Sequence, residues 1–176
     1  ALERDRHVTL FGEVALRGSA GPHTWVAGTA VERDSYRPKD VPQFAHTFTT
    51  PGIFVQDDVM LNAWWTASVS ARADRHSEYG WFLSPRASTM VRGGGWTGRV
   101  SFGTGFFGPS VLTEETEAAG LTGLQIEETL QAERGRSFSL DVTRELGLVS
   151  ATATFFRSTI RHPVHVERET TYTIRN

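Results

Sequence analysis

The feature that most constrains the fold of this 176-residue chain is an alternation of apolar and polar residues with a period of two. In the segment VTLFGEVALR, Val8, Leu10, Val14 and Leu16 share one face, while Arg17 falls on the other. Because successive side chains of a strand point to opposite faces of a sheet, this pattern predicts strands with one apolar face. The same alternation predicts further strands at Thr24–Glu32, Gly52–Leu61, Trp64–Asp74, Phe82–Arg92, Trp96–Gly103, Ser137–Leu146 and Gly147–Ile160, with a weaker one within Val164–Ile174.

The lengths of the predicted connections also alternate along the chain. Short connections lie at Gly18–Pro22, Leu61–Ala63, Gly93–Gly95 and Glu145–Gly147, and longer ones at Arg33–Pro51, Asp74–Trp81 and Thr104–Arg136. Membrane barrels of the outer-membrane type combine short periplasmic turns with longer extracellular loops. We therefore predict an all-β protein, a partial up-and-down antiparallel transmembrane β-barrel of about nine strands.

A soluble β-sandwich is the structural alternative, because its inner face is also apolar and its strands alternate in the same way. Aromatic residues near the predicted strand ends, such as Trp25, Trp65, Trp81 and Trp96, favour the barrel, in which they form girdles at the membrane interfaces. The formal net charge of −2 gives no basic footprint for a nucleic acid.

No constellation of an enzyme or a metal site stands out in the sequence. The chain has no cysteine, which excludes disulfides and thiolate ligands, and none of its six histidines forms a ligand pair at helical spacing. It also contains no Gly-x-Ser-x-Gly motif and no phosphate-binding loop. We therefore expect a protein without catalytic activity, without a metal site and without a cofactor.

One stretch, RVSFGTGFFGPSVLTEETEAAGL, joins a strand to the pattern Gly-x-Gly-Phe-x-x-Pro through Gly103, Gly105, Phe106 and Pro109, followed by an acidic loop. This pattern resembles the barrel of TonB-dependent outer-membrane receptors. Further residues match motifs of that family in the same order: Phe54, Gln56, Asp57, Asp58, Arg72, Asp74, Ser84, Pro85, Arg86, Leu130, Glu133, Ser137, Phe155, Phe156, Ile160 and Val164. The sequence departs from the family pattern at Gly108 and Ala132, where the family often has Ala and Pro.

The resemblance implies that residues 1–176 are part of one receptor barrel, with the plug domain absent from this piece. Transport barrels with a plugged lumen have about 22 strands, so the chain is expected to be a fragment. The implied function is TonB-dependent uptake of a scarce solute across the Gram-negative outer membrane: a siderophore–metal chelate, a corrinoid or an oligosaccharide. The implied partners are outer-membrane lipid, the small-molecule ligand, the plug domain and, through the plug, the TonB complex. A passive porin-like channel and a soluble β-sandwich ligand-binding module are the alternatives.

The resemblance also suggests candidate site residues in the external loops. Ligand contacts are expected from Phe106, Phe107, Glu114, Glu115 and Glu117. Independently of the resemblance, Tyr36, Arg37 and His46 in the long Arg33–Pro51 connection are further candidates for contacts with a chelate, with a surface role as the alternative. A structural role in the family motifs is expected for Gly103, Gly105, Phe106, Pro109, Glu133, Ser84, Pro85 and Arg86. The alternative is a solvated acidic loop whose two phenylalanines pack against the rim. On the lumen wall we expect the polar rows that contain Arg17, Arg72, Arg86, Arg99, Asp141 and Arg144.

Overall fold

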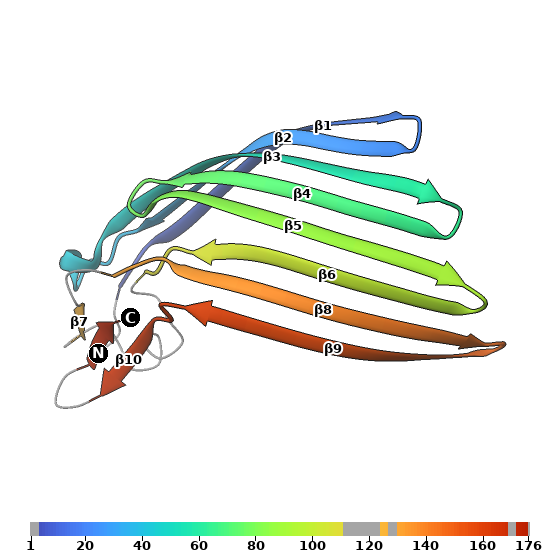
Figure 1. Ribbon diagram of the computed structural model, residues 1–176. Helices are drawn as coiled ribbons and strands as arrows, with labels where there is room; N and C mark the ends of the chain where they lie inside the picture. Colours follow the sequence, from blue (N-terminus) through green and yellow to red (C-terminus); the bar gives the residue numbers. More distant parts are fainter. Residues whose placement is uncertain (1–3, 111–123, 127–129, 169–171, 176) are drawn as a thin grey trace.

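The computed structural model describes residues 4–110, 124–126, 130–168 and 172–175. Within these residues, eight long strands form one antiparallel sheet in the order β1-β2-β3-β4-β5-β6-β8-β9, so that sequence neighbours are also spatial neighbours (Figure 1). Their bounds are β1 His7–Ala20, β2 His23–Tyr36, β3 His46–Asn62, β4 Trp65–His76, β5 Gly80–Gly93, β6 Trp96–Phe107, β8 Glu133–Leu146 and β9 Val149–Arg161. The up-and-down topology confirms the predicted fold class.

Strand structure is present within the predicted segment Val164–Ile174, but it does not join the barrel sheet, so the described residues supply eight barrel strands where about nine were predicted. This part of the chain instead forms β10 (His165–Arg168) and β11 (Tyr172–Arg175), which join β7 (Leu124–Ile126) in a separate three-stranded sheet. The cause lies directly after β9, where His162 has a φ of 53° and the following Pro163 has no N–H to donate to a ladder.

The connections lie at two opposite ends of the sheet (Figure 1). Two-residue turns at 21–22, 63–64, 94–95 and 147–148 occupy one end, which we call the turn end. In the turn at 94–95 glycine is required at both positions, because Gly94 and Gly95 have φ values of 56° and 75°. The opposite end, which we call the loop end, carries the connection 37–45 with the short helix η1 (Pro42–Phe44), and the connection 108–132.

The loops are shorter than the sequence predicts, because the strands extend into them. Strands β2 and β3 take up most of the predicted Arg33–Pro51 loop, and β4 and β5 leave only residues 77–79 of the predicted Asp74–Trp81 loop. That connection is therefore a tight turn, tied to β3 by a hydrogen bond from the Ser77 N–H to the Thr49 carbonyl at 3.0 Å.

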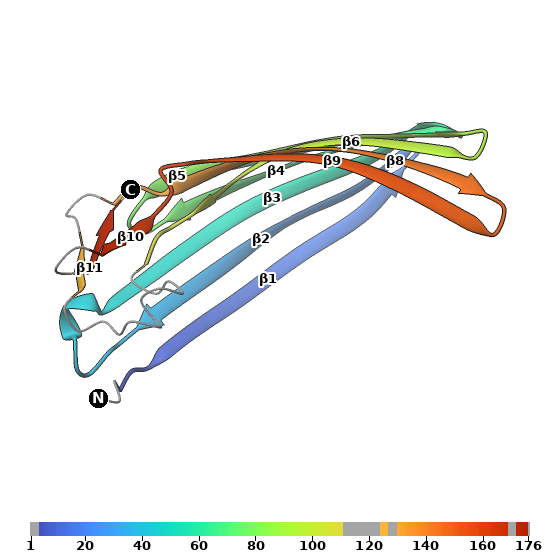
Figure 2. The same ribbon diagram turned by 90° about the horizontal axis from the view of Figure 1, so that it is seen from below.

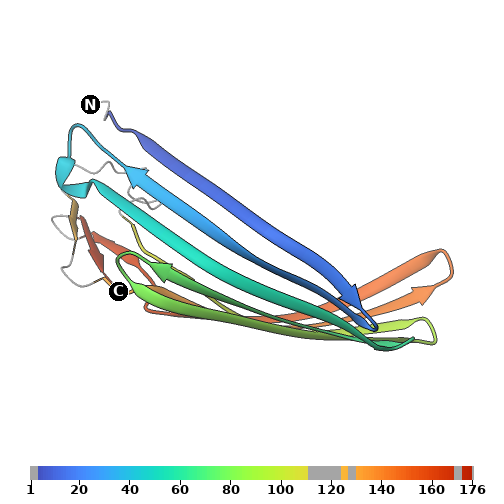
Figure 3. The same ribbon diagram turned by 90° about the horizontal axis from the view of Figure 1, so that it is seen from above.

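The sheet is curled into an open trough, and β1 and β9 each have one neighbouring strand within the described residues (Figures 2 and 3). Its polar rows line the hollow side. The register places Ser68, Ser88, Ser101 and Ser139 opposite one another across four strands, and these serines line a hollow of about 620 Å³. We call this side the lumen face.

The opposite side, the outer face, is apolar and exposed. Leu10 is 61%, Val14 69% and Leu83 67% exposed, although a soluble sandwich would bury such a face. Extended exposed apolar surface of this kind suits contact with lipid. Within the described residues, no helix is long and apolar enough to span a membrane.

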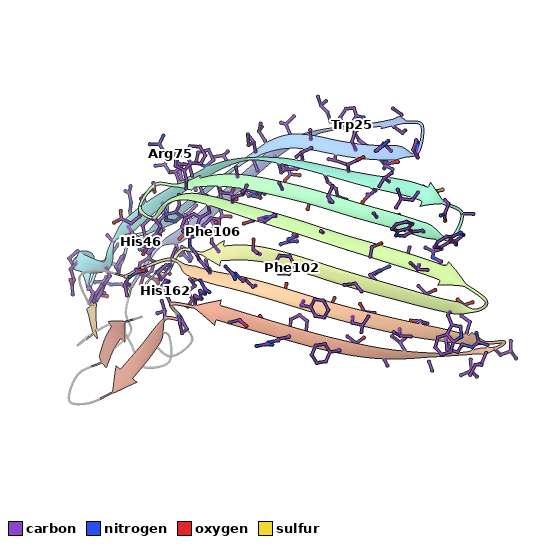
Figure 4. The ribbon with its side chains drawn as sticks, in the orientation of Figure 1. Trp25, His46, Arg75, Phe102, Phe106 and His162 are labelled. Atoms are coloured by element: carbon purple, nitrogen blue, oxygen red, sulfur yellow. The ribbon has the colours of Figure 1, made fainter. Side chains whose placement is uncertain are left out.

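Tryptophans lie near the turn end of the sheet. Trp25, Trp65 and Trp96 are the first or third residues of their strands and are all exposed, and Trp64 lies in the turn before β4 (Figure 4 labels Trp25). Trp81 is exposed at the loop end. Aromatic side chains at both ends of an apolar face are the arrangement of a barrel that crosses two membrane interfaces.

The predicted lumen rows are confirmed for most of their charged members and wrong for one. Arg99 lies opposite Asp141, and both flank the serine rows of the lumen face. Arg144 lies instead opposite Trp96, with its guanidinium carbon 5.0 Å from the indole centroid, and it donates a hydrogen bond to the Gly94 carbonyl. A position one residue away from the polar row lies on the other face, because the side-chain period is two.

Candidate functional site

A row of aromatic and imidazole rings crosses the lumen face at the loop end. Successive centroids lie 5.9 Å apart from His7 to Tyr36, 5.7 Å from Tyr36 to His46 and 4.5 Å from His46 to Phe48. The register explains the row, because His7, Tyr36 and His46 are directly opposite one another on β1, β2 and β3. Opposite side chains on one sheet face have Cβ atoms about 5 Å apart, so large rings meet there.

The row continues onto β4 and into the following turn. Phe48 lies 4.9 Å from His76, and His76 lies 4.9 Å from Tyr79, measured between ring centroids. Tyr79 is partly buried, and this burial together with the negative charge of Glu78 raises the pKa of its phenol. The hydroxyl is therefore protonated at neutral pH, and it donates a hydrogen bond of 2.9 Å to the Pro109 carbonyl.

Asp34 on β2 connects two histidines of this row. One carboxylate oxygen lies 2.6 Å from His7 Nε2 and accepts a hydrogen bond of 2.8 Å from the Thr9 hydroxyl. The other oxygen lies 3.4 Å from His46 Nε2. The carboxylate thus fixes the His7 imidazole by a hydrogen bond and lies next to the His46 imidazole, and both imidazoles belong to the ring row. Among the described residues, no group of three or more His, Cys, Asp and Glu side chains is arranged to hold a metal ion.

A buried carboxylate lies below the ring row on the same face. Asp74 is 3% exposed, and its two oxygens lie 2.8 and 2.9 Å from Arg72 Nε. The neighbouring strand has Gly52 opposite Asp74, where an added Cβ would overlap the carboxylate. The absence of a side chain at position 52 therefore makes room for the Arg72–Asp74 pair.

The loop end of β6 bends over this region. Phe106 stacks on the buried Phe82 with ring centroids 3.8 Å apart and an angle of 6° between the planes, and the Arg134 guanidinium lies 5.3 Å from the Phe82 centroid. Gly108 then packs against the ring row, because a Cβ there would lie 2.9 Å from His76 Nε2. Buried Pro109 follows.

These elements enclose a hollow of about 460 Å³ at the loop end of the lumen face. Its walls combine aromatic rings with charges of both signs. The lining residues are Phe11, Glu32, Asp34, Phe48, Thr50, Arg72, Asp74, His76, Phe106, Phe107, Gly108 and Ser110. Such a surface can stack a planar group of a ligand and hydrogen-bond to its polar substituents.

The structure places four of the predicted ligand residues at the loop end of the lumen face. Tyr36 and His46 belong to the ring row, and Phe106 and Phe107 line the hollow (Figure 4 labels His46 and Phe106 at the loop end). Arg37 does not join them, because it lines a different hollow together with Val8, Leu10 and Ser35 of the outer face. Glu114, Glu115 and Glu117 lie outside the described residues.

The predicted motif residues occupy the wall next to the hollow. Gly103 is paired with Arg86, and a Cβ at Gly103 would lie 3.2 Å from the Arg86 Cγ atom. Ser84 is opposite Arg72, and Pro85 is opposite Ala71. The Glu133 carboxylate accepts a hydrogen bond of 2.6 Å from the Val164 N–H, which fixes the chain after β9. Gly105 lies opposite Gly135 in the ladder of β6 and β8.

The sequence did not predict several residues of the hollow as site residues: Phe11, Asp34, Phe48, Asp74 and His76. Asp34 and Phe48 fall inside the predicted Arg33–Pro51 loop, and His76 falls inside the predicted Asp74–Trp81 loop. The available signal was the period of two: continuing the strands through these segments places all three on the lumen face.

Comparisons with known proteins identify the family. The family described as "TonB dependent receptor-like, beta-barrel" matches residues 5–175. A comparison with curated proteins found no match.

Solved structures with the same fold include two receptors and one iron transporter. The siderophore receptor PirA from Pseudomonas aeruginosa is 19% identical, with a TM-score of 0.81 over 99% of this chain and 34% of its own. A mutant of the ferric enterobactin receptor PfeA from the same species is 14% identical, with a TM-score of 0.77 over 98% and 31%. The FrpB iron transporter from Neisseria meningitidis is 15% identical, with a TM-score of 0.76 over 98% and 31%.

The chain thus spans about a third of the length of these receptors. Its sheet supplies eight strands of a barrel whose apolar face is turned outward, and its family consists of receptors and transporters rather than enzymes. This overturns the soluble sandwich alternative. The chain belongs to the TonB-dependent receptor family, as part of the β-barrel that lies in the Gram-negative outer membrane.

Proposed function

We propose that this barrel segment forms part of the external mouth of a receptor that takes up a scarce solute. A siderophore–metal chelate is favoured as this solute over a corrinoid or an oligosaccharide. The observation that carries this proposal is the aromatic and charged hollow on the lumen face at the loop end. The names of the similar structures, siderophore and ferric enterobactin receptors and an iron transporter, support a metal chelate as the solute.

The geometry of the hollow supports a contact role for the Phe106–Phe107 pair. Phe106 is held in place by its stack on Phe82, and Phe107 is 58% exposed beside it. Rigid aromatic side chains contribute contact area at a low entropic cost. The charges of Arg72, Asp74 and Glu32 supply hydrogen-bonding groups below the rings.

We also propose that the remaining strands, the plug domain and, through the plug, the contact with the TonB complex belong to other parts of the same receptor. Two facts support this. The chain covers 34% of the PirA structure, and β1 and β9 each have one strand neighbour within the described residues. An unpaired strand edge is not tolerated in lipid, so further strands have to close the barrel.

The test is the affinity with which cells that carry the full-length receptor bind iron chelates. The double variant Phe106→Ala/Phe107→Ala is expected to weaken chelate binding by about tenfold or more, since buried aromatic contacts dominate ligand affinity. The matched control is Phe102→Ala, on the same strand but among the exposed residues of the outer face. Equal affinity of the double variant and the wild type would refute the site.

A passive porin-like channel remains the second candidate, and it differs in its energy requirement. Uptake through the proposed receptor stops when the TonB complex is deleted or the proton-motive force is dissipated. Uptake that continues unchanged under both conditions would refute the receptor proposal and support the passive channel.

A further inference from the structure

Three arginines gather on the outer face where β1 and β2 reach the loop end. Arg33 lies in β2, Arg6 precedes β1 and Arg37 follows β2. Backbone hydrogen bonds join Arg6 and Arg37 in both directions, at 3.2 and 2.9 Å, so these two residues extend the ladder and lie directly opposite each other. Together with Val8, Leu10 and Ser35, the three arginines line a hollow of about 270 Å³.

The charges in this hollow are unbalanced. No carboxylate lines it, and none of the ion pairs found among the described residues involves Arg6, Arg33 or Arg37. Like charges directly opposite each other on a sheet destabilise the pairing. A bound anion removes this repulsion, and the planar guanidinium groups match the oxygen geometry of a phosphate.

The surroundings of the hollow are those of a membrane surface. Leu10 forms part of its floor and lies opposite Arg33, and the same face of β1 continues through the exposed Val14 and Leu16. On β4, Arg75 lies on the same face at the loop end, opposite the exposed Trp81 (Figure 4 labels Arg75).

The charged side chains at the turn end of this face have partners within the protein. Asp57 lies opposite Trp25 there, and its carboxylate is 2.6 Å from His23 Nδ1. Arg144 also lies on this face at the turn end, but its guanidinium lies over Trp96 and donates a hydrogen bond to the Gly94 carbonyl. The cluster of three arginines lies at the loop end, where anionic headgroups attract clustered basic side chains.

We propose that Arg6, Arg33 and Arg37 bind the phosphate group of a phosphorylated lipid in the outer leaflet, with its acyl chains lying along Val8 and Leu10. A free anion would satisfy the arginines equally well. The apolar floor of the hollow and its continuity with the lipid-facing rows favour a lipid instead.

The test uses the full-length receptor in discs of uncharged lipid, titrated with a fluorescent bis-phosphorylated glycolipid. Replacing Arg6, Arg33 and Arg37 together by Gln is expected to weaken binding about a hundredfold, because each basic residue at a membrane surface contributes about fivefold. Replacing all three by Lys keeps the charges and is expected to retain most of the affinity. Equal binding by the wild type and the Gln variant would overturn the proposal.

The matched control changes three arginines of the lumen face by the same charge, Arg17, Arg92 and Arg99 to Gln, and is expected to keep the affinity of the wild type. An equal loss in this control would show a nonspecific charge effect and overturn the site. If the triple Gln variant does not fold into a barrel, Arg33→Gln alone is used. This variant is expected to lose about fivefold in affinity, and an unchanged affinity would refute the proposal.

The identity of the ligand is tested in the same titration. The dephosphorylated glycolipid is expected to bind the wild type as weakly as the phosphorylated lipid binds the Gln variant. Inorganic phosphate is expected not to displace the lipid at matched concentration. Binding of the dephosphorylated lipid with full affinity, or displacement by inorganic phosphate, would overturn the assignment of a phosphorylated lipid.

Discussion

The substitution Gly52→Ala tests whether the lumen wall depends on a strand glycine to hold a buried ion pair. An added Cβ would lie 3.1 Å from both Asp74 Cγ and Arg72 Nη2 and would overlap an Asp74 oxygen. Side-chain contacts this short force the carboxylate away from its present position. Both of its hydrogen bonds to Arg72 Nε, at 2.8 and 2.9 Å, are then lost.

The expected cost follows from the nature of these bonds. Hydrogen bonds to charged groups contribute roughly 1.5–3 kcal/mol to stability. The Arg72 side chain is 35% exposed, so water screens part of the interaction and the low end applies. We expect Gly52→Ala to lower the free energy of unfolding by about 1.5 kcal/mol.

The assay is urea unfolding of the full-length receptor in lipid vesicles, with Gly98→Ala as the matched control. Gly98 is also a strand glycine, but a Cβ there meets nothing within 4 Å. Its replacement is expected to be neutral or to stabilise by up to about 1 kcal/mol, because alanine restricts the unfolded chain. Equal stability of the two variants would contradict the steric reasoning.

A double-mutant cycle isolates the cause of the effect. In an Asp74→Ala background there is no carboxylate for the new Cβ to displace, so Gly52→Ala is expected to cost almost nothing there. If the substitution costs the same with and without Asp74, its effect arises from the backbone and the ion pair does not explain the glycine.

Three further predictions concern the faces and the loop end. Leu140→Arg on the outer face is expected to destabilise the barrel by about 2–4 kcal/mol in vesicle unfolding, whereas Ser139→Arg on the lumen face is tolerated. A larger loss of stability for Ser139→Arg than for Leu140→Arg would contradict the assignment of the two faces. Tyr79→Phe removes the hydrogen bond to the buried Pro109 carbonyl. It should cost about 1 kcal/mol in the same assay, and an unchanged stability would show that water replaces the bond. Gly108→Ala places a Cβ 2.9 Å from a histidine nitrogen of the ring row, so it is expected to weaken chelate binding in a titration; wild-type affinity would argue against packing of this loop on the site.

The residues of the hollow show why the sequence predicted only part of the site. Phe106 is part of a family motif and Phe107 follows it, and Tyr36 and His46 lie in the predicted Arg33–Pro51 loop. Phe48 carried no such signal, and its importance comes from ring contacts with His46 and His76 on either side. A contact between side chains on different strands depends on register, which a single sequence does not display.

Arg37 is a second example of the same limit. As a cation in a predicted external loop it was a reasonable candidate for a ligand contact. In the structure the ladder of β1 and β2 continues one pair beyond Tyr36, which places Arg37 on the outer face beside Arg6 and opposite in direction to the ring row.

The sequence by itself determined the strands, their apolar and polar faces and the alternation of turns and loops, because these depend on a period of two and on local turn residues such as Gly94 and Gly95. Tertiary structure decided where the strands end, how the sheet curls and which residues meet across it. Asp34 reaches two histidines, Gly52 makes room for Asp74, and Gly108 packs on His76 only through pairings between segments distant in sequence. These pairings depend on the hydrogen bonds of the whole ladder, so no local pattern reveals them.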